Sequence, residues 1–392
     1  MNARVLTSID EVTGAEWNAL IGDGAPFLRH EFLAALEHQH CVGADSGWKP
    51  CHLVLADAAQ KGGRGTLRAA IPLYRKLHSW GEFVFDFAWA QAYAHHGLDY
   101  YPKLVSAVPF TPASGPRLLV RPGDDAASVR RELLDAALAY AADEDVSSLH
   151  VLFPVEDQAR ELYGRGLLPR RDCQFHWHNR GYADFDAFLE TFTAEKRKKT
   201  RRERRRVTEA GIEFRVLAGG ELDAAEWRRV HALHSDTFLR HGHTPYLGVE
   251  FFLEIARSLP ESVIVQAALR GKRMVAAAIC FRGADALYGR YWGANEGHHS
   301  LHFETCYHQG IEYCIREGLR RFEPGTQGEH KVSRGFEPTL TWSAHWIGDA
   351  RFASAIEAYL RREAVAVDEY AAEIAQHVPY KDRAAIGRAV NQ

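Results

Sequence analysis

The sequence has 392 residues, of which 46% are hydrophobic and 25% charged, and its formal net charge is −3. This composition is ordinary for a globular protein, and the length predicts two domains, each with a core of its own. The small net charge excludes a global attraction to nucleic acids or anionic membranes, so any such attraction must come from a local patch.

No apolar run approaches the roughly 18 residues that a membrane helix needs, and the N-terminus lacks the apolar core of a secretory signal. The six cysteines stand far apart, at 41, 51, 173, 280, 306 and 314, and none belongs to a Cys-x-x-Cys pair. Cysteines in this pattern indicate buried thiols in a reducing compartment. We therefore expect a cytoplasmic protein without an integral membrane segment.

The first half predicts an amphipathic helix, a β-hairpin, a longer helix and a buried strand, in that order. Apolar residues at helical spacing mark the helices, and two apolar runs around a polar, glycine-rich connector mark the hairpin. The expected helices are 27–38 and 126–142, and the expected strands are 52–56, 67–74 and 149–153.

The second half repeats much of this order. Its most regular helix is expected at 301–318, because apolar residues recur there every three or four positions and Gly318 suits a C-terminal cap. The other expected helices are 223–240 and 351–377, and the expected strands are 212–216, 262–268, 274–281, 286–292 and one around Phe322.

The shared order suggests a diverged internal duplication. In each half a hairpin precedes a helix, a strand and a glycine–proline segment, at 166–169 in the first half and 335–338 in the second. Two α/β domains that share this order by chance are the alternative. We expect residues 1–178 and 179–350 to form the two halves, and residues 351–392 to form a C-terminal helix that packs on the core.

An aromatic insertion, residues 75–115, distinguishes the first half. Nine of the 31 residues from 80 to 110 are aromatic, and charged residues and histidines are interspersed among them. Rigid rings with a few charges suit a groove for a ligand that has apolar and polar parts. A well-packed cover for a sheet edge is the alternative, and buried charges would then need partners. The candidate substrate-binding residues here are Asp86, Trp89, Tyr93, Tyr101 and Lys103.

Residues 195–206 are strongly basic, since nine of the twelve are Lys or Arg. A helix with this sequence would be charged on every face, and we expect that it cannot pack into a core. It would then be either a solvated arm or a site for an anion, such as the phosphates of a tRNA, a lipid diphosphate or a nucleotide. The candidate anion-binding residues are Arg201, Arg202, Arg204 and Arg205.

The region 287–336 predicts a strand, a loop, a helix, a second strand and a polar loop rich in ionisable groups. Loops at strand ends commonly carry function, and a helix N-terminus beside strand ends suits an anion or an acyl donor. The candidate residues of the polar loop are Gln327, Glu329, His330, Lys331 and Arg334.

This region resembles the FemAB-like branch of the GNAT acyltransferase superfamily. In that branch an aromatic strand leads to a helix, a strand and a glycine loop, and a lysine stands shortly before Gly-Phe. The matching features are 288–292, 301–318, 322–328 and Lys331 before Gly335. The basic run is similar to the family's basic helix. The aromatic insertion is similar to that of members labelled as peptidoglycan biosynthesis or recognition proteins.

The resemblance implies a mixed α/β fold of two tandem GNAT-like halves that transfers an acyl or aminoacyl group to an amine. It implies acyl-CoA or aminoacyl-tRNA as co-substrate and no tightly bound cofactor. A tRNA is thus a candidate partner, and a cell-wall precursor or a small amine is the candidate acceptor. The loop 293–300 departs from the Arg/Gln-x-x-Gly-x-Gly/Ala pattern that binds the CoA pyrophosphate.

The family motif gives Lys331 a role, and the chemistry of amide formation suggests roles for other residues. Lys331 is the candidate for stabilising the tetrahedral oxyanion of acyl transfer. His330 or Glu329 is the candidate acceptor of the amine proton, and Tyr291 the candidate donor to the leaving group. The further candidate substrate-binding residues are Arg290, His302, Glu304, Gln327 and Arg334.

Two other functions are compatible with the sequence. A degenerate acyltransferase fold could bind a peptidoglycan fragment without catalysis, and consumption of an acyl donor would separate the two functions. The 21 histidines also suggest a metal site, because some of them cluster at 95–96, 176–178 and 298–302. Such clusters are weak evidence without a paired carboxylate motif, so we predict no metal site.

Overall fold

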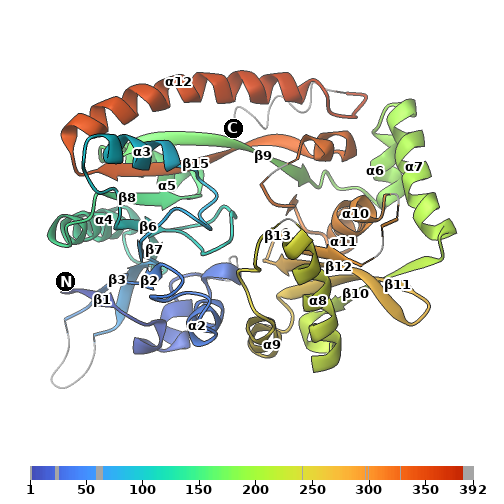
Figure 1. Cartoon of the computed structure of the whole chain (residues 1–392), viewed down its shortest axis with the longest axis horizontal. Coiled ribbons are helices and arrows are strands. Elements are labelled where there is room, and N and C mark those ends of the chain that lie inside the picture. The colour runs from blue at the N-terminus through green and yellow to red at the C-terminus, as the bar shows by residue number, and fades with distance from the viewer. Residues whose placement is uncertain are drawn as a thin grey trace. The chain divides into compact units, whose positions relative to one another are not determined.

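The computed structural model describes residues 2–22, 26–58, 65–240, 242–295, 297–298, 300–326 and 328–382 (Figure 1). The chain divides into two compact units. Unit 1 comprises Met1–Asp172 and Thr341–Asp368, and unit 2 comprises Cys173–Leu340 and Glu369–Gln392. This division differs from the expected boundaries after residues 178 and 350. The chain returns to unit 1 after unit 2, and both crossings fall inside long strands, β9 and β15, that the sequence analysis missed.

Unit 1 contains an antiparallel sheet of order β1-β3-β4-β7 and a second set of strands in the order β15-β8-β6-β5-β2. Neighbours in the second set are antiparallel except β6 and β8, which are parallel. The strand bounds are β1 Asn2–Leu6, β2 Trp48–Pro50, β3 His52–Ala56, β4 Leu67–Ile71, β5 Tyr74–Lys76, β6 Lys103–Ser106, β7 Leu119–Val120, β8 Ser148–Leu152 and β15 Glu337–Ile347.

The strand expected at 67–74 is two strands in the structure. β4 pairs with β3, whereas β5 pairs with β6 in the other set. Pro72 lies between them, and proline has no N–H to donate to a strand ladder. The chain therefore leaves one sheet at the proline and enters the other.

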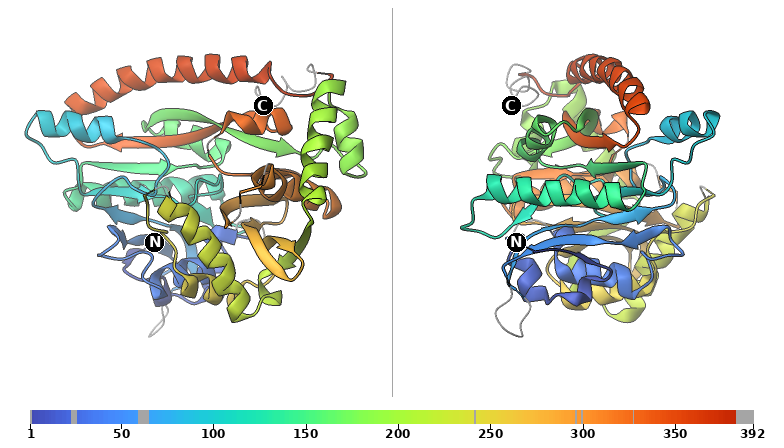
Figure 2. Two further views of the ribbon diagram at one scale, coloured as in Figure 1. Left: turned by 45° about the vertical axis from the view of Figure 1, so that its right-hand side comes forward. Right: turned by 90° about the vertical axis from the view of Figure 1, so that its left-hand side faces the viewer.

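Helix α4 (Ala126–Asp143) provides much of the core of unit 1, within one residue of its expected bounds. Its buried face carries Val129, Leu133 and Ala137, which pack with side chains of β3, β4 and β8. The right-hand view of Figure 2 shows α4, in blue-green, in front of the strands of unit 1. The other helices of unit 1 are η1 Ile9–Glu11, α1 Gly14–Asn18, η2 Pro26–Leu28, α2 His30–His38, α3 Phe87–His95 and α5 Glu156–Gly164; α12 Ala350–Ala375 begins here and ends in unit 2.

Unit 2 is built on strands in the order β10-β11-β12-β13-β14-β9. Neighbours are antiparallel except β13 and β14, which are parallel. The strand bounds are β9 Leu168–His178, β10 Ile212–Ala218, β11 Val263–Arg270, β12 Arg273–Arg282, β13 Ala286–Ala294 and β14 Arg321–Glu323. The helix bounds are α6 Phe185–Glu190, α7 Ala194–Glu209, η3 Gly219–Glu221, α8 Ala224–Arg240, α9 Val249–Ser258, α10 Leu301–Phe303, η4 Glu304–His308, α11 Gln309–Arg316 and η5 Glu329–Arg334.

The helix expected at 301–318 is interrupted by one π-turn, η4. Gln266 of β11 explains the interruption, because its buried side-chain amide enters the widened turn. In the orientation that gives both the nitrogen and the oxygen of this amide a partner, the amide nitrogen donates to the Thr305 carbonyl. The amide oxygen then accepts from the Gly310 N–H at 3.2 Å. π-Turns inside α-helices frequently mark functional sites. Here the turn lies beside the polar loop that the sequence singled out.

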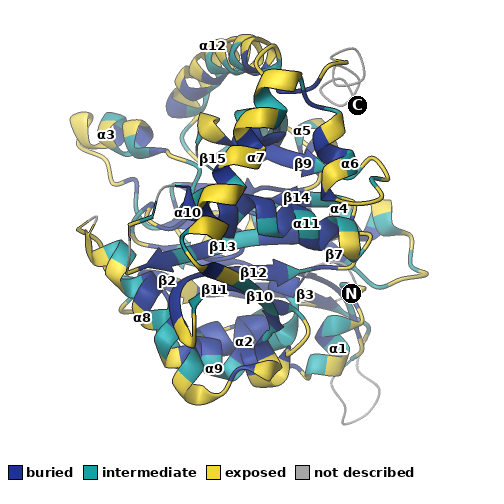
Figure 3. Ribbon diagram, turned by 90° about the vertical axis from the view of Figure 1, so that its right-hand side faces the viewer, coloured by how far each residue is buried: buried dark blue, intermediate teal, exposed yellow. Residues whose placement is uncertain are grey.

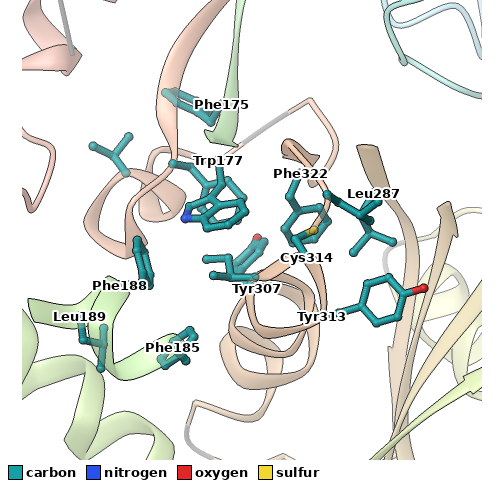
Figure 4. Close-up of a cluster of buried hydrophobic side chains, with 14 of the residues drawn as sticks. Phe175, Trp177, Phe185, Phe188, Leu189, Leu287, Tyr307, Tyr313, Cys314 and Phe322 are labelled. Atoms are coloured by element: carbon teal, nitrogen blue, oxygen red, sulfur yellow. The ribbon is translucent and has the colours of Figure 1, made fainter. Parts of the chain in front are cut away.

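An aromatic core holds this helix against the strands of unit 2. Trp177 and Phe175 of β9 converge with Phe188 of α6 and Tyr307 of η4 (Figure 4). Close backbone approach occurs on the other side of β13, where a Cβ at Gly293 would lie 2.0 Å from the Leu233 carbonyl of α8. Most strand residues are buried, whereas α7 exposes much of its surface (Figure 3). Within the described ranges, the structure contains no helix with the length and apolar character needed to cross a membrane.

Candidate active site

Lys331 lies on the short 3-10 helix η5, which follows β14. Gly328 and Gly335 flank η5 with φ of 110° and 93°, a region that glycine adopts readily. The Lys331 side chain is turned inward, only 2% of the residue is exposed, and Nζ donates to the Gly325 carbonyl at 2.7 Å. Burial lowers the pKa of Lys331 from 10.5 to about 7. At neutral pH this lysine can therefore be either a cation or a neutral amine.

His330, the neighbouring residue, is exposed, and its Nε2 lies 2.8 Å from the Tyr307 hydroxyl of η4. Partial burial and the cations Lys331 and Arg334 lower the pKa of His330. Burial raises the pKa of Tyr307, which keeps the phenol protonated. A neutral imidazole next to a buried amine is suited to accept a proton.

His302 extends this group along the helix. Its ring lies 4.9 Å from that of Trp292 and 6.0 Å from that of His330, measured between ring centres. Burial lowers the pKa of His302 to about 4, so the imidazole is neutral at physiological pH. Glu329, by contrast, is exposed and accepts a hydrogen bond from Tyr370 at 3.0 Å. Both base candidates are thus paired with a tyrosine hydroxyl, and His330 is the one directly next to Lys331 in the chain.

Arg334 is buried and has two kinds of partner. Its Nη2 lies 3.0 Å from a carboxylate oxygen of Glu203 in α7, and its Nη1 donates to the His330 carbonyl at 2.7 Å. The guanidinium carbon also lies 3.4 Å from the centre of the Phe303 ring. Arg334 was predicted as a substrate-binding residue, and in this structure its Nη1 and Nη2 donate to groups of the protein itself.

Glu304 is also committed to protein partners. Its carboxylate accepts from Arg204 of α7 at 3.1 Å and from Gln309 at 2.8 Å. Burial raises the pKa of Glu304, although Arg204 opposes the shift. Arg204 in turn reaches Glu312 at 2.6 Å, so this arginine bridges two carboxylates of the helix.

Strands β13 and β14 separate near the polar loop. They are paired only where Ala286–Tyr288 faces Arg321–Glu323, and β13 continues to Ala294 while β14 ends. On that side the structure, over the residues it describes, gives β13 no strand partner beyond Tyr288. The free edge can receive an extended chain through main-chain hydrogen bonds.

Arg290 and Tyr291 lie on this free stretch of β13. Burial lowers the pKa of Arg290, and its guanidinium carbon lies 5.3 Å from the centre of the Tyr291 ring. The Tyr291 ring packs against His234 of α8 and Phe252 of α9, at 4.9 and 5.9 Å between ring centres. The assigned role of Tyr291 as proton donor stays a prediction.

The basic run forms helix α7, and the expectation that every face would be charged and unable to pack was wrong. Thr200, Glu203 and Val207 are buried at a spacing of three and four residues, so α7 has an inner face. Among the predicted anion-binding residues, Arg201 pairs with Asp186 at 3.0 Å, Arg204 pairs with Glu304 and Glu312, and Arg205 pairs with Glu209 at 3.5 Å.

A different set of cations on α7 is available to a ligand. Arg202 has no acidic partner within the described part of the chain, and the same holds for Lys196, Lys198, Lys199 and Arg206. Lys198, Arg202 and Arg206 follow one another every four residues, which places them on one side of the helix. We call Lys198, Lys199, Arg202 and Arg206 the free basic stripe.

The charged residues of the aromatic insertion form a buried cluster within unit 1. Lys103 is fully buried, and its Nζ lies 2.5 Å from Asp86 and 2.8 Å from Glu82. Burial opposes the ionisation of Asp86, but Lys103 outweighs it and lowers the pKa of Asp86 to about 2. The buried charges Glu82, Asp86 and Lys103 thus have partners inside the protein, as a packed insertion requires.

The aromatic candidates of the insertion lie around that cluster. Trp89 and Tyr93 of α3 are buried in a small core with side chains of α12, and Tyr101 is half-buried with its hydroxyl 2.8 Å from Ser79. Their proposed contact with a substrate stays a prediction. Gln327 lies outside the described residues. Within those residues the structure shows no group of three or more His, Cys, Asp or Glu side chains that could hold a metal ion.

The sequence analysis missed three residues that shape the site. Glu203 was overlooked inside the basic run, although Thr200 and Val207 at helical spacing could have indicated an inner face. Tyr307 lay in the expected helix 301–318, and nothing in the sequence around it indicated a contact with His330. Gln266 lay in an expected strand, and no local pattern indicates that a strand glutamine enters a helix.

Comparison with known proteins gives a family match and a shared fold. Residues 8–382 match the FemAB-like family, described as peptidoglycan biosynthesis/recognition. No curated protein sequence matches the chain.

Solved structures share the fold. The C-terminal domain of a provisionally assigned lysylphosphatidylglycerol synthetase from Agrobacterium fabrum is similar with a TM-score of 0.54 and 9% identity, over 90% of this chain and 96% of that one. FemX is similar with a TM-score of 0.53 and 11% identity, over 91% of this chain and 100% of that one. A tandem GNAT protein from the clavulanic acid biosynthesis pathway has a TM-score of 0.45 and 12% identity, over 89% of this chain and 98% of that one. The expected mixed α/β fold, of the FemX type, is confirmed.

Proposed function

We propose, from the premise that this chain belongs to the FemAB-like family of peptidoglycan biosynthesis or recognition proteins, that it is an N-acyltransferase with its active site in unit 2. The reaction joins an acyl or aminoacyl group to an amine. The acceptor is a cell-wall precursor or another small amine, and the product is an amide.

The observation that carries this proposal is the environment of Lys331. A lysine that is 2% exposed, has a pKa of about 7 and lies beside a neutral histidine is unusual for a purely structural residue. Its Nζ donates to a backbone carbonyl, Gly325, at 2.7 Å, so its present partner is an oxygen. The carbonyl oxygen of an acyl donor can take that place without leaving a buried charge unpaired.

The proposed mechanism assigns each proton a place. The acceptor amine attacks the carbonyl carbon of the donor, the N–C bond forms, and the oxyanion is stabilised by the Lys331 ammonium. His330 accepts the amine proton at Nδ1, in the tautomer whose Nε2–H donates to the Tyr307 oxygen. Collapse of the intermediate then breaks the bond to the leaving oxygen or sulfur, which takes up the proton that His330 accepted, so the histidine is neutral again.

The co-substrate is proposed to be acyl-CoA or aminoacyl-tRNA, and both carry phosphates. The free basic stripe of α7 suits phosphates of either donor, because its cations have no acidic partner in the described structure. The free edge of β13 suits the extended part of a donor that carries amide groups, since such groups complete a strand ladder.

A direct assay tests the proposal with both classes of donor. The purified chain is incubated with acetyl-CoA, or with total tRNA charged with amino acids, together with a peptidoglycan pentapeptide precursor. The product is measured by its gain in mass. Wild type should consume donor and modify the acceptor amine, whereas Lys331→Ala should lose about 10²–10³-fold in turnover. Lys272→Ala, at the exposed turn between β11 and β12, is the matched control.

Consumption of neither donor, with the precursor still bound, would instead support a protein that binds a peptidoglycan fragment without catalysis. Loss of activity in the Lys272 control as well as in Lys331→Ala would contradict the role given to Lys331. Turnover is read from the reaction mixtures, and binding of the precursor is measured separately by titrating the protein with it.

A further inference from the structure

One acidic residue of the basic helix α7 faces the interior. Glu203 is 7% exposed, whereas Glu195 and Glu209 on the same helix are exposed. A carboxylate is rarely buried unless it is paired. Its partner here is Arg334, whose Nη2 lies 3.2 and 3.0 Å from the two carboxylate oxygens of Glu203.

Arg334 carries this contact to the backbone of the candidate active site. While Nη2 is held by Glu203, Nη1 donates to the carbonyl of His330 at 2.7 Å. The Phe303 ring covers the guanidinium, with its centre 3.4 Å from the guanidinium carbon. The arginine is therefore fixed by a carboxylate and a ring, and it holds the peptide unit that joins His330 to Lys331.

The η5 helix depends on such a tether. It is six residues long and lies between Gly328 and Gly335, two glycines with positive φ. Glycine has the largest conformational freedom of any residue, so flanking glycines do little to hold a short helix in place. The inward direction of Lys331, toward the Gly325 carbonyl, must come from side-chain contacts instead.

We propose that Glu203 is a positioning residue for the active site, which holds η5 through Arg334 so that Lys331 stays directed at the position of the Gly325 carbonyl. The inference rests on the proposed function only in naming Lys331 as the catalytic group. Buried His308 is a second neighbour of Glu203, with its Nε2 4.0 Å from the same carboxylate, beyond hydrogen-bond distance. Burial holds the pKa of His308 well below its usual value, so this histidine adds no charge and leaves Arg334 as the partner of Glu203.

The test compares Glu203→Gln, which keeps the shape and removes the charge, with Glu209→Gln as the matched control on the same helix. Glu209 is exposed and pairs with Arg205 at 3.5 Å, away from η5. Backbone hydrogen exchange of the full chain is measured without any substrate. In Glu203→Gln, exchange of residues 329–334 should rise about tenfold or more, because a charge-assisted tether is lost. Exchange in β11 and β12 should not change.

Labelling of lysines by acetic anhydride over a range of pH gives a second readout. This readout would not change if Glu203 only stabilised the fold. In wild type, Lys331 should react with a midpoint near pH 7, as its burial requires. In Glu203→Gln the midpoint should shift upward, toward that of a hydrated lysine, because Nζ is no longer held inside. Surface lysines such as Lys198 serve as internal references.

Unchanged exchange at 329–334 together with an unchanged Lys331 midpoint would overturn the proposal. Faster exchange spread evenly over unit 2 would also overturn it, because it would show general destabilisation. If Glu203→Gln does not fold, Glu203→Asp and Arg334→Lys replace it, and each should show a smaller rise confined to 329–334. Neither measurement uses a donor, so an inactive protein with the expected exchange pattern would contradict the proposed function and leave this inference standing.

Discussion

The Tyr307 hydroxyl and Nε2 of His330 lie 2.8 Å apart, and the two residues come from different elements, η4 and η5. The contact links the helix that follows β13 to the polar loop that follows β14. Because partial burial and two nearby cations lower the pKa of His330, the contact joins two neutral groups at physiological pH. It can therefore fix the tautomer of the histidine without fixing its charge.

Replacing Tyr307 by Phe tests this contact. The ring stays in the aromatic core, so stability should change little, whereas turnover should fall roughly five- to tenfold, the value of one hydrogen bond. KM for the acceptor should not move, because binding is unchanged. The control is Tyr313→Phe, whose hydroxyl accepts from Arg282 at 3.1 Å on the same helix. Equal effects of the two variants on turnover would contradict the role of Tyr307.

The low pKa of Lys331 also predicts how stability depends on pH. The folded pKa is about 7 and the ordinary value is 10.5, so between these values the unfolded chain binds more protons than the folded chain. The free energy of unfolding of wild type, relative to that of Lys331→Met, should therefore rise as pH increases from 7 to 10.5. The full rise is at most about 5 kcal/mol. Denaturant titrations at several pH values measure it, and a difference independent of pH would contradict the burial argument.

The buried cluster of unit 1 predicts a large loss of stability for Lys103→Met. The variant leaves Glu82 and Asp86 without their shared cation at 2.8 and 2.5 Å. Removing one partner of a buried ion pair costs about 3–5 kcal/mol. Lys49→Met, at an exposed position of β2, should change stability by less than about 0.5 kcal/mol. Thermal unfolding of both variants checks the prediction, and similar midpoints for the two would contradict it.

The free basic stripe predicts a salt-dependent attraction for polyanions. Changing Lys198, Lys199, Arg202 and Arg206 to Gln should weaken binding of a total tRNA preparation. In a plot of log affinity against log salt concentration, the slope should also become shallower by up to about three. Three exposed cations elsewhere in unit 2 serve as the control, namely Arg228, Arg257 and Lys272. An unchanged slope would mean that the stripe is only a solvated surface.

Local patterns predicted most elements of the fold. The strand at His52–Ala56 has the expected bounds, and helices α4 and α8 match within one residue. These segments have strong periodicity and clear ends, so neighbouring residues determine them. The strands β9 and β15 were missed, because β9 mixes basic and apolar residues without regular alternation. Their place is decided by pairing with distant strands, which a local pattern does not contain.

The candidate site was predictable in part. The family motif indicated Lys331, and ionisable density indicated the loop around it. Its burial could not be predicted, because the side chain is covered by segments that are distant in sequence. The same reason applies to Glu203, more than 100 residues away from the arginine it holds. Asp86 and Lys103 were noted as charges that would need partners if buried, and the structure pairs them with each other.

The charge of Lys331 during turnover is the central claim, and the pH profile of Lys331→Arg tests it most directly. In wild type, kcat should fall as pH rises through about 7, because the ammonium that stabilises the oxyanion is lost. Arginine keeps its charge in this range, so kcat of the variant, although lower near pH 6, should show no such fall between pH 7 and 9. The same fall in both proteins would contradict the claim.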